Sequence, residues 1–186
     1  MIIALQKKKE NIVEYLLYMF NIEGMIRTLN FDLKEIEPAL IAQYDVDEEK
    51  AEEIKKWYAD LIAEMRTSGI QEKGHLEELH EIITELNLLH STLLNIYQDD
   101  QYKSLNEKAN EAIIDLIDKS GKKNIGPIEA AINGLYGLLV LRMGNKQVSP
   151  ATEAAFVSIS ELLAVLAHRY KDMKAGTLDL PMHQKN

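Results

Sequence analysis

The amino-acid sequence predicts an all-α fold, and three features of its 186 residues support this class. Apolar residues recur at steps of three and four along most of the chain, which is the spacing of one face of an α-helix. The chain has only 9 glycines and 4 prolines, too few for the many tight turns of a β-sandwich or barrel. Its apolar and charged fractions, 46% and 27%, are ordinary for a globular domain. We therefore expect a single-domain helical bundle of about six to seven helices.

The N-terminal third of the chain predicts three helices. The first spans Leu5–Leu29 and ends near Asn30 and Phe31. A short helix follows over 32–43, with Asp32 as its N-cap. Asp47 is a good N-cap for the third helix, which has the cleanest apolar stripe in the chain and ends before Gly69.

Four further helices are expected in the rest of the chain. The fourth spans Leu76–Tyr97 and has an apolar face so wide that more than one neighbour must cover it. A fifth helix covers about Tyr102–Lys119. The sixth, 127–143, and the seventh, which starts at Pro150, each begin with a proline in the first turn, where its missing N–H does no harm.

The sixth helix is expected to lie at the centre of the fold. It is apolar on nearly all sides, and such helices are usually buried. Ala130, Gly134 and Gly137 would let a neighbouring helix approach closely. No Gly/Ser-rich linker divides the chain, so residues 1–176 are predicted to form one helical domain. Residues 177–186 lack periodicity and are predicted to be a mobile C-terminal tail.

Composition argues against several classes of function. A chain without cysteine has no disulfides, thiolate nucleophiles or cysteine-based zinc sites, and it fits a reducing cytoplasm. A net charge of −9 opposes nucleic-acid binding, which depends on Lys and Arg at the phosphates. The most apolar segment, 125–143, is interrupted by Glu129, Asn133 and Arg142, so we expect no membrane span. No phosphate-binding or dinucleotide-binding glycine motif occurs, and no cofactor is expected.

Three of the five histidines lie in the stretch KGHLEELHEIITELNLLH, residues 73–90. On a helix, His75 and His80 would point about 140° apart, because they are five residues apart. One metal ion could not easily bind both, so no metal site is predicted and these two histidines need no special role. His90 lies within the apolar stripe. We expect a buried histidine bonded to a neighbouring carbonyl or polar side chain, with a ligand contact as the alternative.

An acid and a base on the first helix form the second unusual feature. Glu23 shares its side of the helix with Leu16 and Phe20, and Arg27 lies one turn further along. Charges that face a core must be paired, because an unpaired buried charge is very unfavourable.

Two interpretations of these charges follow. In the first, Glu23 and Arg27 form an internal ion pair that fixes helix register or cap contacts, with Arg142 as a third member. In the second, Glu23, Arg27, His90 and Arg142 line a pocket that orients a small polar ligand, for example an acid held by arginine.

The chain also resembles a known family. The segments KKKENIVEYLLYMFNIEGMIRTLNFD, EKGHL, GLYGLLVLRM and SPATEAAFVSISELLAVLAHRYK are similar to an uncharacterised bacterial family, a domain of unknown function made of helices. These segments stand in order and cover most of the chain. The resemblance implies the helical fold and brings no catalytic or binding residues.

Three functions are weighed on this basis. The first is a non-enzymatic module of a bacterial cytoplasm that associates with another protein or with itself, as in a homodimer, through an apolar helix face. The second is a small polar-ligand-binding bundle or enzyme that uses Glu23, Arg27, His90 and Arg142. The third is a metal-dependent helical enzyme centred on the histidine stretch 73–90.

Overall fold

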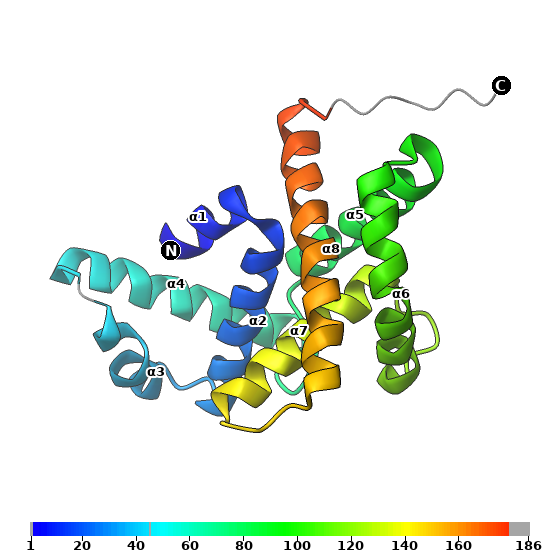
Figure 1. Cartoon of the computed structure of the whole chain (residues 1–186). Helices are drawn as coiled ribbons and strands as arrows, with labels where there is room; N and C mark the ends of the chain where they lie inside the picture. Colours follow the sequence, from blue (N-terminus) through cyan, green and yellow to red (C-terminus); the bar gives the residue numbers. More distant parts are fainter. Residues whose placement is uncertain (1, 45, 179–186) are drawn as a thin grey trace.

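The computed structural model describes residues 2–44 and 46–178, and this part of the chain contains eight α-helices and no β-strand. A 3-10 helix and a π-helix complete its regular structure. The helices are α1 (Ile2–Glu10), α2 (Ile12–Thr28), α3 (Leu33–Ala39), α4 (Glu48–Thr67), α5 (Glu77–Thr92), α6 (Asp100–Ser120), α7 (Pro127–Met143) and α8 (Pro150–Ala175). The predicted all-α, single-domain fold is confirmed (Figure 1).

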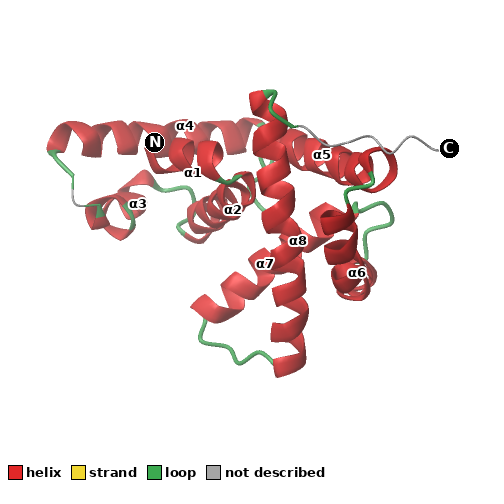
Figure 2. Cartoon of the chain, turned by 45° about the horizontal axis from the view of Figure 1, so that its top comes forward, coloured by secondary structure: helices red, strands yellow, loops and turns green. Residues whose placement is uncertain are grey.

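The long helix α8 runs through the middle of the molecule. Helices α1 to α4 lie on one side of it and α5 and α6 on the other, while α7 crosses it (Figure 1 and Figure 2). One contiguous core contains buried side chains from every α-helix. The core therefore joins the two sides into one domain.

The predicted first helix, Leu5–Leu29, is wrong in one respect, because the chain breaks it at Asn11. The backbone of Asn11 is extended, with φ −151° and ψ 107°, and its side chain accepts hydrogen bonds from the amides of Val13 and Glu14. Asn11 is thus the N-cap of a new helix, α2. The break lies in the polar segment 6–11, where no apolar residue gives a spacing that could mark the end of one helix and the start of the next.

The end of the predicted fourth helix also differs from a regular α-helix. Its last turn, Leu93–Tyr97, is a π-helix, and Gln98 follows with a positive φ of 53°. Asp99 then caps α6 by accepting from the amide of Tyr102. The second carboxylate oxygen of Asp99 accepts from Nε of Arg169 on α8, at 2.9 Å. This almost buried acid fixes the corner between α5, α6 and α8.

Helix α7 is central only in its first half. Ile128, Ala130, Ala131 and Ile132 are all buried. The second half reaches the surface, and in Figure 2 the C-terminal end of α7 and the N-terminal end of α8 project beyond the other helices. The prediction of a central apolar helix over 127–143 therefore holds for its N-terminal half alone.

Helix α8 is also unusually long and apolar. Among the described residues it is the one helix long and apolar enough to cross a membrane by length and composition, with 28% of its most apolar window buried. Core helices of soluble proteins meet the same criterion. Beyond α8, Leu178 packs against the core, and most of the predicted tail, 179–186, lies outside the described residues.

Candidate functional site

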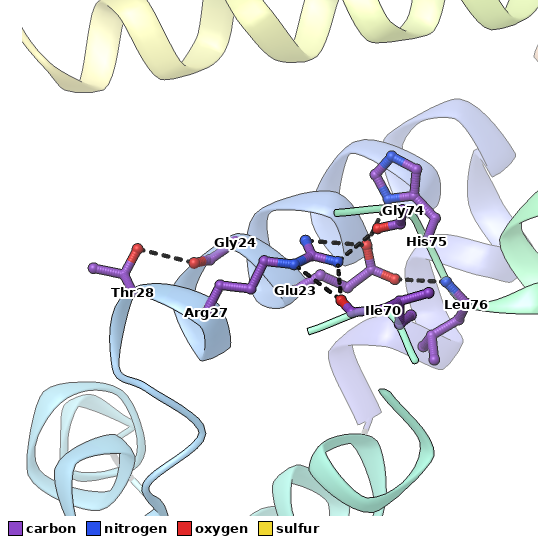
Figure 3. Close-up of polar contacts among 8 residues, drawn as sticks. All are labelled: Glu23, Gly24, Arg27, Thr28, Ile70, Gly74, His75 and Leu76. Carbon is purple, nitrogen blue, oxygen red and sulfur yellow. Dashed lines mark hydrogen bonds and ion pairs between the residues drawn. The ribbon is translucent and has the colours of Figure 1, made fainter. Parts of the chain in front are cut away.

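The carboxylate of Glu23 is a fully buried charged group that is bonded through both of its oxygens. Helix α2 carries it toward the core, and the side chain has no exposed surface. Its Oε1 accepts from the backbone N–H of Leu76 at 2.9 Å, and its Oε2 lies 2.6 Å from Nδ1 of His75 (Figure 3). Both oxygens thus bind the segment that leads into α5.

Arg27 lies one turn along α2 and completes this cluster. Its Nη1 is 3.9 Å from Oε2 of Glu23, so the two charges form the predicted internal pair. Its Nη2 donates to the carbonyl oxygens of Ile70 and Gly74, at 3.1 and 2.6 Å (Figure 3). The predicted pairing of an acid and a base on the inner side of this helix is confirmed.

His75 was predicted to need no special role, and that prediction is wrong. Its ring stacks on Phe20, with the ring centroids 3.7 Å apart, and Nδ1 bonds Glu23. The helical-wheel argument fails because His75 precedes α5, and Gly74 before it has a positive φ of 98°. The rings of His75 and His80 lie in an edge arrangement with their centroids 6.0 Å apart. A wheel angle does not apply where one residue lies outside the helix.

The cluster of Glu23, Arg27 and His75 fastens the α4–α5 loop to α2. Leu76 is the N-cap of α5, and its own side chain makes no capping bond. Glu23, which lies on α2, accepts a hydrogen bond from the N–H of Leu76. The acid of a capping box makes the same bond within one helix. Its negative charge near the start of α5 is also favourable. Arg27 satisfies two loop carbonyls, so the arrangement closes and orders the loop.

Few groups of this cluster are left to bind a ligand. A carboxylate only accepts hydrogen bonds, so Nδ1 of His75 carries the proton toward Glu23. In the neutral ring, Nε2 is then a proton acceptor, and among the described residues it has no hydrogen-bond partner. The Glu23 oxygens and the Nε and Nη2 atoms of Arg27 are already hydrogen-bonded to protein groups, whereas Nη1 of Arg27 has only the 3.9 Å ion-pair contact with Glu23.

Tyr136 of α7 packs against α2 at Phe20 and Gly24. Its ring meets the ring of Phe20 edge-on, with the centroids 5.6 Å apart. A Cβ atom on Gly24 would lie 2.7 Å from the Tyr136 hydroxyl, so a larger residue there would require the Tyr136 side chain to move. Burial raises the pKa of Tyr136; the charge of Arg27 opposes this, and that of Glu23 adds to it.

The other two predicted site residues lie in separate contacts. Nδ1 of His90 bonds the hydroxyl of Tyr102 at 2.7 Å, as expected for a buried histidine, and burial lowers the pKa of His90. Arg142 pairs with Glu153 of α8, and its side chain is 56% exposed. The structure thus brings Glu23 and Arg27 together with His75. It places His90 and Arg142 in contacts of their own.

No metal-binding group is found in the part of the chain that the structure describes. Within it, no three or more His, Asp or Glu side chains are grouped so that they could hold an ion.

A second candidate site is the exposed half of α7. Its large apolar side chains are Leu139, Val140, Leu141 and Met143, with exposed fractions of 37%, 47%, 46% and 55%. Val157 of α8 is exposed beside them. We call the side chains of residues 137–144 on this surface the α7 ridge. The sequence indicates an apolar helix here, but which half the fold covers depends on the tertiary arrangement.

Clefts flank the α7 ridge on both sides. One, of about 360 Å³, lies between α2, the end of α3 and α7, and Met25, Leu29 and Leu40 help to line it. The other, of about 430 Å³, lies between α7 and α8, and Leu135, Leu138 and Phe156 help to line it. The ridge thus stands between two largely apolar depressions.

Comparison with known proteins identifies one family. A family model described as Domain of unknown function (DUF4924) matches residues 1–177. No curated protein and no solved structure matches the chain. The segments on which the resemblance was noted lie within the matched range. The chain therefore belongs to the DUF4924 family of domains of unknown function.

Proposed function

We propose that this chain is a non-enzymatic protein-association module of a bacterial cytoplasm, and that it binds its partner through the α7 ridge. The observation that carries the proposal is the uncovered half of α7. A helix that is apolar on all sides is normally buried along its whole length. Here the five consecutive residues Leu139, Val140, Leu141, Arg142 and Met143 are all exposed.

The shape of this surface supports the same function. Helices pack by inserting the ridge of one into the groove of another. The α7 ridge and its flanking clefts, of about 360 and 430 Å³, provide both parts on one face. Contiguous exposed apolar surface of this kind is typical of protein-binding sites.

The buried polar cluster favours a structural role over catalysis. Glu23 bonds the loop through both oxygens, and Arg27 donates to two backbone carbonyls. These contacts resemble capping and loop closure, in which no ligand is required. A ligand pocket made of Glu23, Arg27, His90 and Arg142 loses its support, since Arg142 is paired with Glu153 and His90 with Tyr102.

The cytoplasmic part of the proposal has a chemical basis. The chain has no cysteine, which is compatible with a compartment where disulfides do not form. Its net charge of −9 favours solubility and disfavours contact with nucleic acid.

Photo-crosslinking in the producing cells tests the association surface. A photoreactive phenylalanine analogue replaces Val140 in one protein and Leu88 of α5 in another, because both positions are exposed and apolar. We expect covalent adducts from position 140 that are lost when Gly137→Leu is added, and few adducts from position 88. Equal labelling at both positions, or no adduct at position 140, would contradict the proposal.

A further inference from the structure

Gly137 is a glycine that the fold itself does not require. It lies in the interior of α7 on the exposed side, and a Cβ atom there would meet no atom within 4 Å. A glycine in a helix interior costs about 1 kcal/mol relative to alanine. At Gly134, by contrast, a Cβ would lie 2.6 Å from Leu116. Within the described residues, the Leu116 side chain occupies the space beside Gly134, whereas no atom occupies the space beside Gly137.

The residues around Gly137 form a symmetric pattern in the segment GLLVLRMG, residues 137–144. Gly137 and Gly144 are seven residues apart and lie within about 20° of one line along the helix. Val140 and Leu141 are midway between them and project about 50° to either side of that line. All four residues are exposed. The line thus has a glycine notch at each end and an apolar side chain on each side of its centre.

This pattern suits a second copy of the same chain packed antiparallel. In a two-fold dimer the same surface of both copies must be complementary to itself. A two-fold axis between Val140 and Leu141 places Gly137 of one copy opposite Gly144 of the other. It also places Val140 opposite Val140 and Leu141 opposite Leu141. The two glycine pairs would let the helix axes approach to about 8 Å, the close end of the usual range.

The charges near the ridge permit this contact. The chain has 30 acidic residues, yet residues 130–147 contain none and include only Arg142 and Lys146 as charges. Arg142 is paired with Glu153 within its own chain. Glu161, also on α8, borders the α7–α8 cleft away from the glycine line. Two copies can therefore meet along α7 without bringing unpaired acids together.

We propose that the partner of the α7 ridge is a second copy of this chain, packed antiparallel about a two-fold axis between Val140 and Leu141. This inference rests on the proposed function, because it uses the same surface, and it names the occupant.

Single cysteines test the register, because the parent chain has no cysteine. With axes about 8 Å apart, the Cβ atoms of the two copies of residue 140 come within about 4 Å, the distance that a disulfide needs. We expect Val140→Cys and Leu141→Cys to form disulfide-linked dimers at least tenfold faster under mild oxidation than the control Leu88→Cys. Equal rates in the three proteins would overturn the antiparallel register.

Sedimentation of the purified chain tests the partner. The parent is expected at twice its 21.2 kDa mass at micromolar concentration, and Gly137→Leu as a monomer with unchanged helical circular dichroism, because the open space accepts a side chain without disturbing the fold. A monomeric parent at about 100 μM would overturn the second-copy inference. If position 140 still formed adducts with other proteins in cells, the proposed function would stand without it, so the two failures are distinguishable.

Discussion

Glu23 connects parts of the chain that are far apart in sequence, since its carboxylate bonds His75 and Leu76, 52 and 53 residues away. Its position on the apolar side of a predicted helix was enough to predict that it is buried and paired. The identity of its closest partner was not predictable in this way. His75 stands in a loop whose geometry Gly74 sets through a positive φ, and helical spacing carries no information there.

Removal of the Glu23 carboxylate is expected to destabilise the fold strongly. Glu23→Ala leaves the Leu76 amide and the Arg27 charge without their acceptor, and breaking a buried pair typically costs about 3–5 kcal/mol. Glu23→Gln should cost less, because its amide oxygen can still accept from Leu76. Chemical denaturation measures both. Hydrogen exchange at the Leu76 amide should rise in the alanine variant.

Glu14 on the same helix provides the control for this prediction. Its side chain is 59% exposed and pairs with Lys7 at the surface, where ion pairs contribute little. Glu14→Ala should leave the denaturation midpoint nearly unchanged. Similar losses for the two alanine variants would contradict a special role of Glu23.

His90 should make folding stability depend on pH. Burial lowers the pKa of His90 below its usual value of 6.5, so the unfolded chain binds a proton at a higher pH than the folded chain does. The stability is therefore complete above about pH 6.5 and falls as the pH decreases toward the folded pKa.

Urea denaturation at pH 7.5 and pH 5.5 measures this effect. The parent should lose more stability between these values than His90→Gln, which can keep a hydrogen bond to Tyr102 but does not titrate. His80→Gln, at an exposed position, should behave like the parent. Identical pH dependence in the parent and His90→Gln would rule out the proposed contribution.

Among the elements, helix starts were the most predictable features. Asp32 and Asp47, the two predicted N-caps, both accept backbone hydrogen bonds in that position, because short polar side chains suit it. Asn11 has the same chemistry but was not predicted as an N-cap, because it lies in the polar segment 6–11, where no apolar spacing marks a break. A break in such a segment is visible only when each possible capping residue is considered on its own.

Two glycines should respond to alanine in opposite ways. Gly137→Ala is expected to raise stability by about 1 kcal/mol, because its Cβ meets nothing and alanine favours a helix. Gly24→Ala should lower stability, because the Tyr136 hydroxyl lies 2.7 Å from the new Cβ and the aromatic ring must move. Thermal unfolding measures the change in stability of both variants. Each variant also carries Val140→Glu, so that association of two chains does not contribute. A stabilising Gly24→Ala would contradict the close approach of α7 to α2.

At the scale of the whole molecule, composition and periodicity predicted one all-helical domain. They did not predict how the helices are arranged in space. The apolar character of α7 was evident from residues 127–143, yet only the fold reveals that Ile132 is buried and Val140 is not. The environment of Arg142 was likewise not predictable from the sequence. It lies in an apolar segment, but the packing brings it to the surface beside Glu153.

The continuous core predicts one cooperative unfolding transition. Trp57, the only tryptophan, lies in α4 and packs against the core at one side of the molecule. Its fluorescence should follow unfolding on that side, while far-ultraviolet circular dichroism follows all helices. The guanidinium midpoints of the two signals should coincide, because buried residues of α4 such as Tyr58 and Met65 belong to the common core. A separate fluorescence transition would mean that α4 unfolds independently.

The bond from Leu76 to Glu23 also constrains the order in which the chain can fold. The start of α5 lacks a side-chain cap of its own and receives its acceptor from α2. That acceptor arrives only when a loop of about fifty residues has closed, which carries an entropic penalty before any contact forms. The first turn of α5 should therefore become stable only after α2 has docked, even though the rest of that helix has good local spacing.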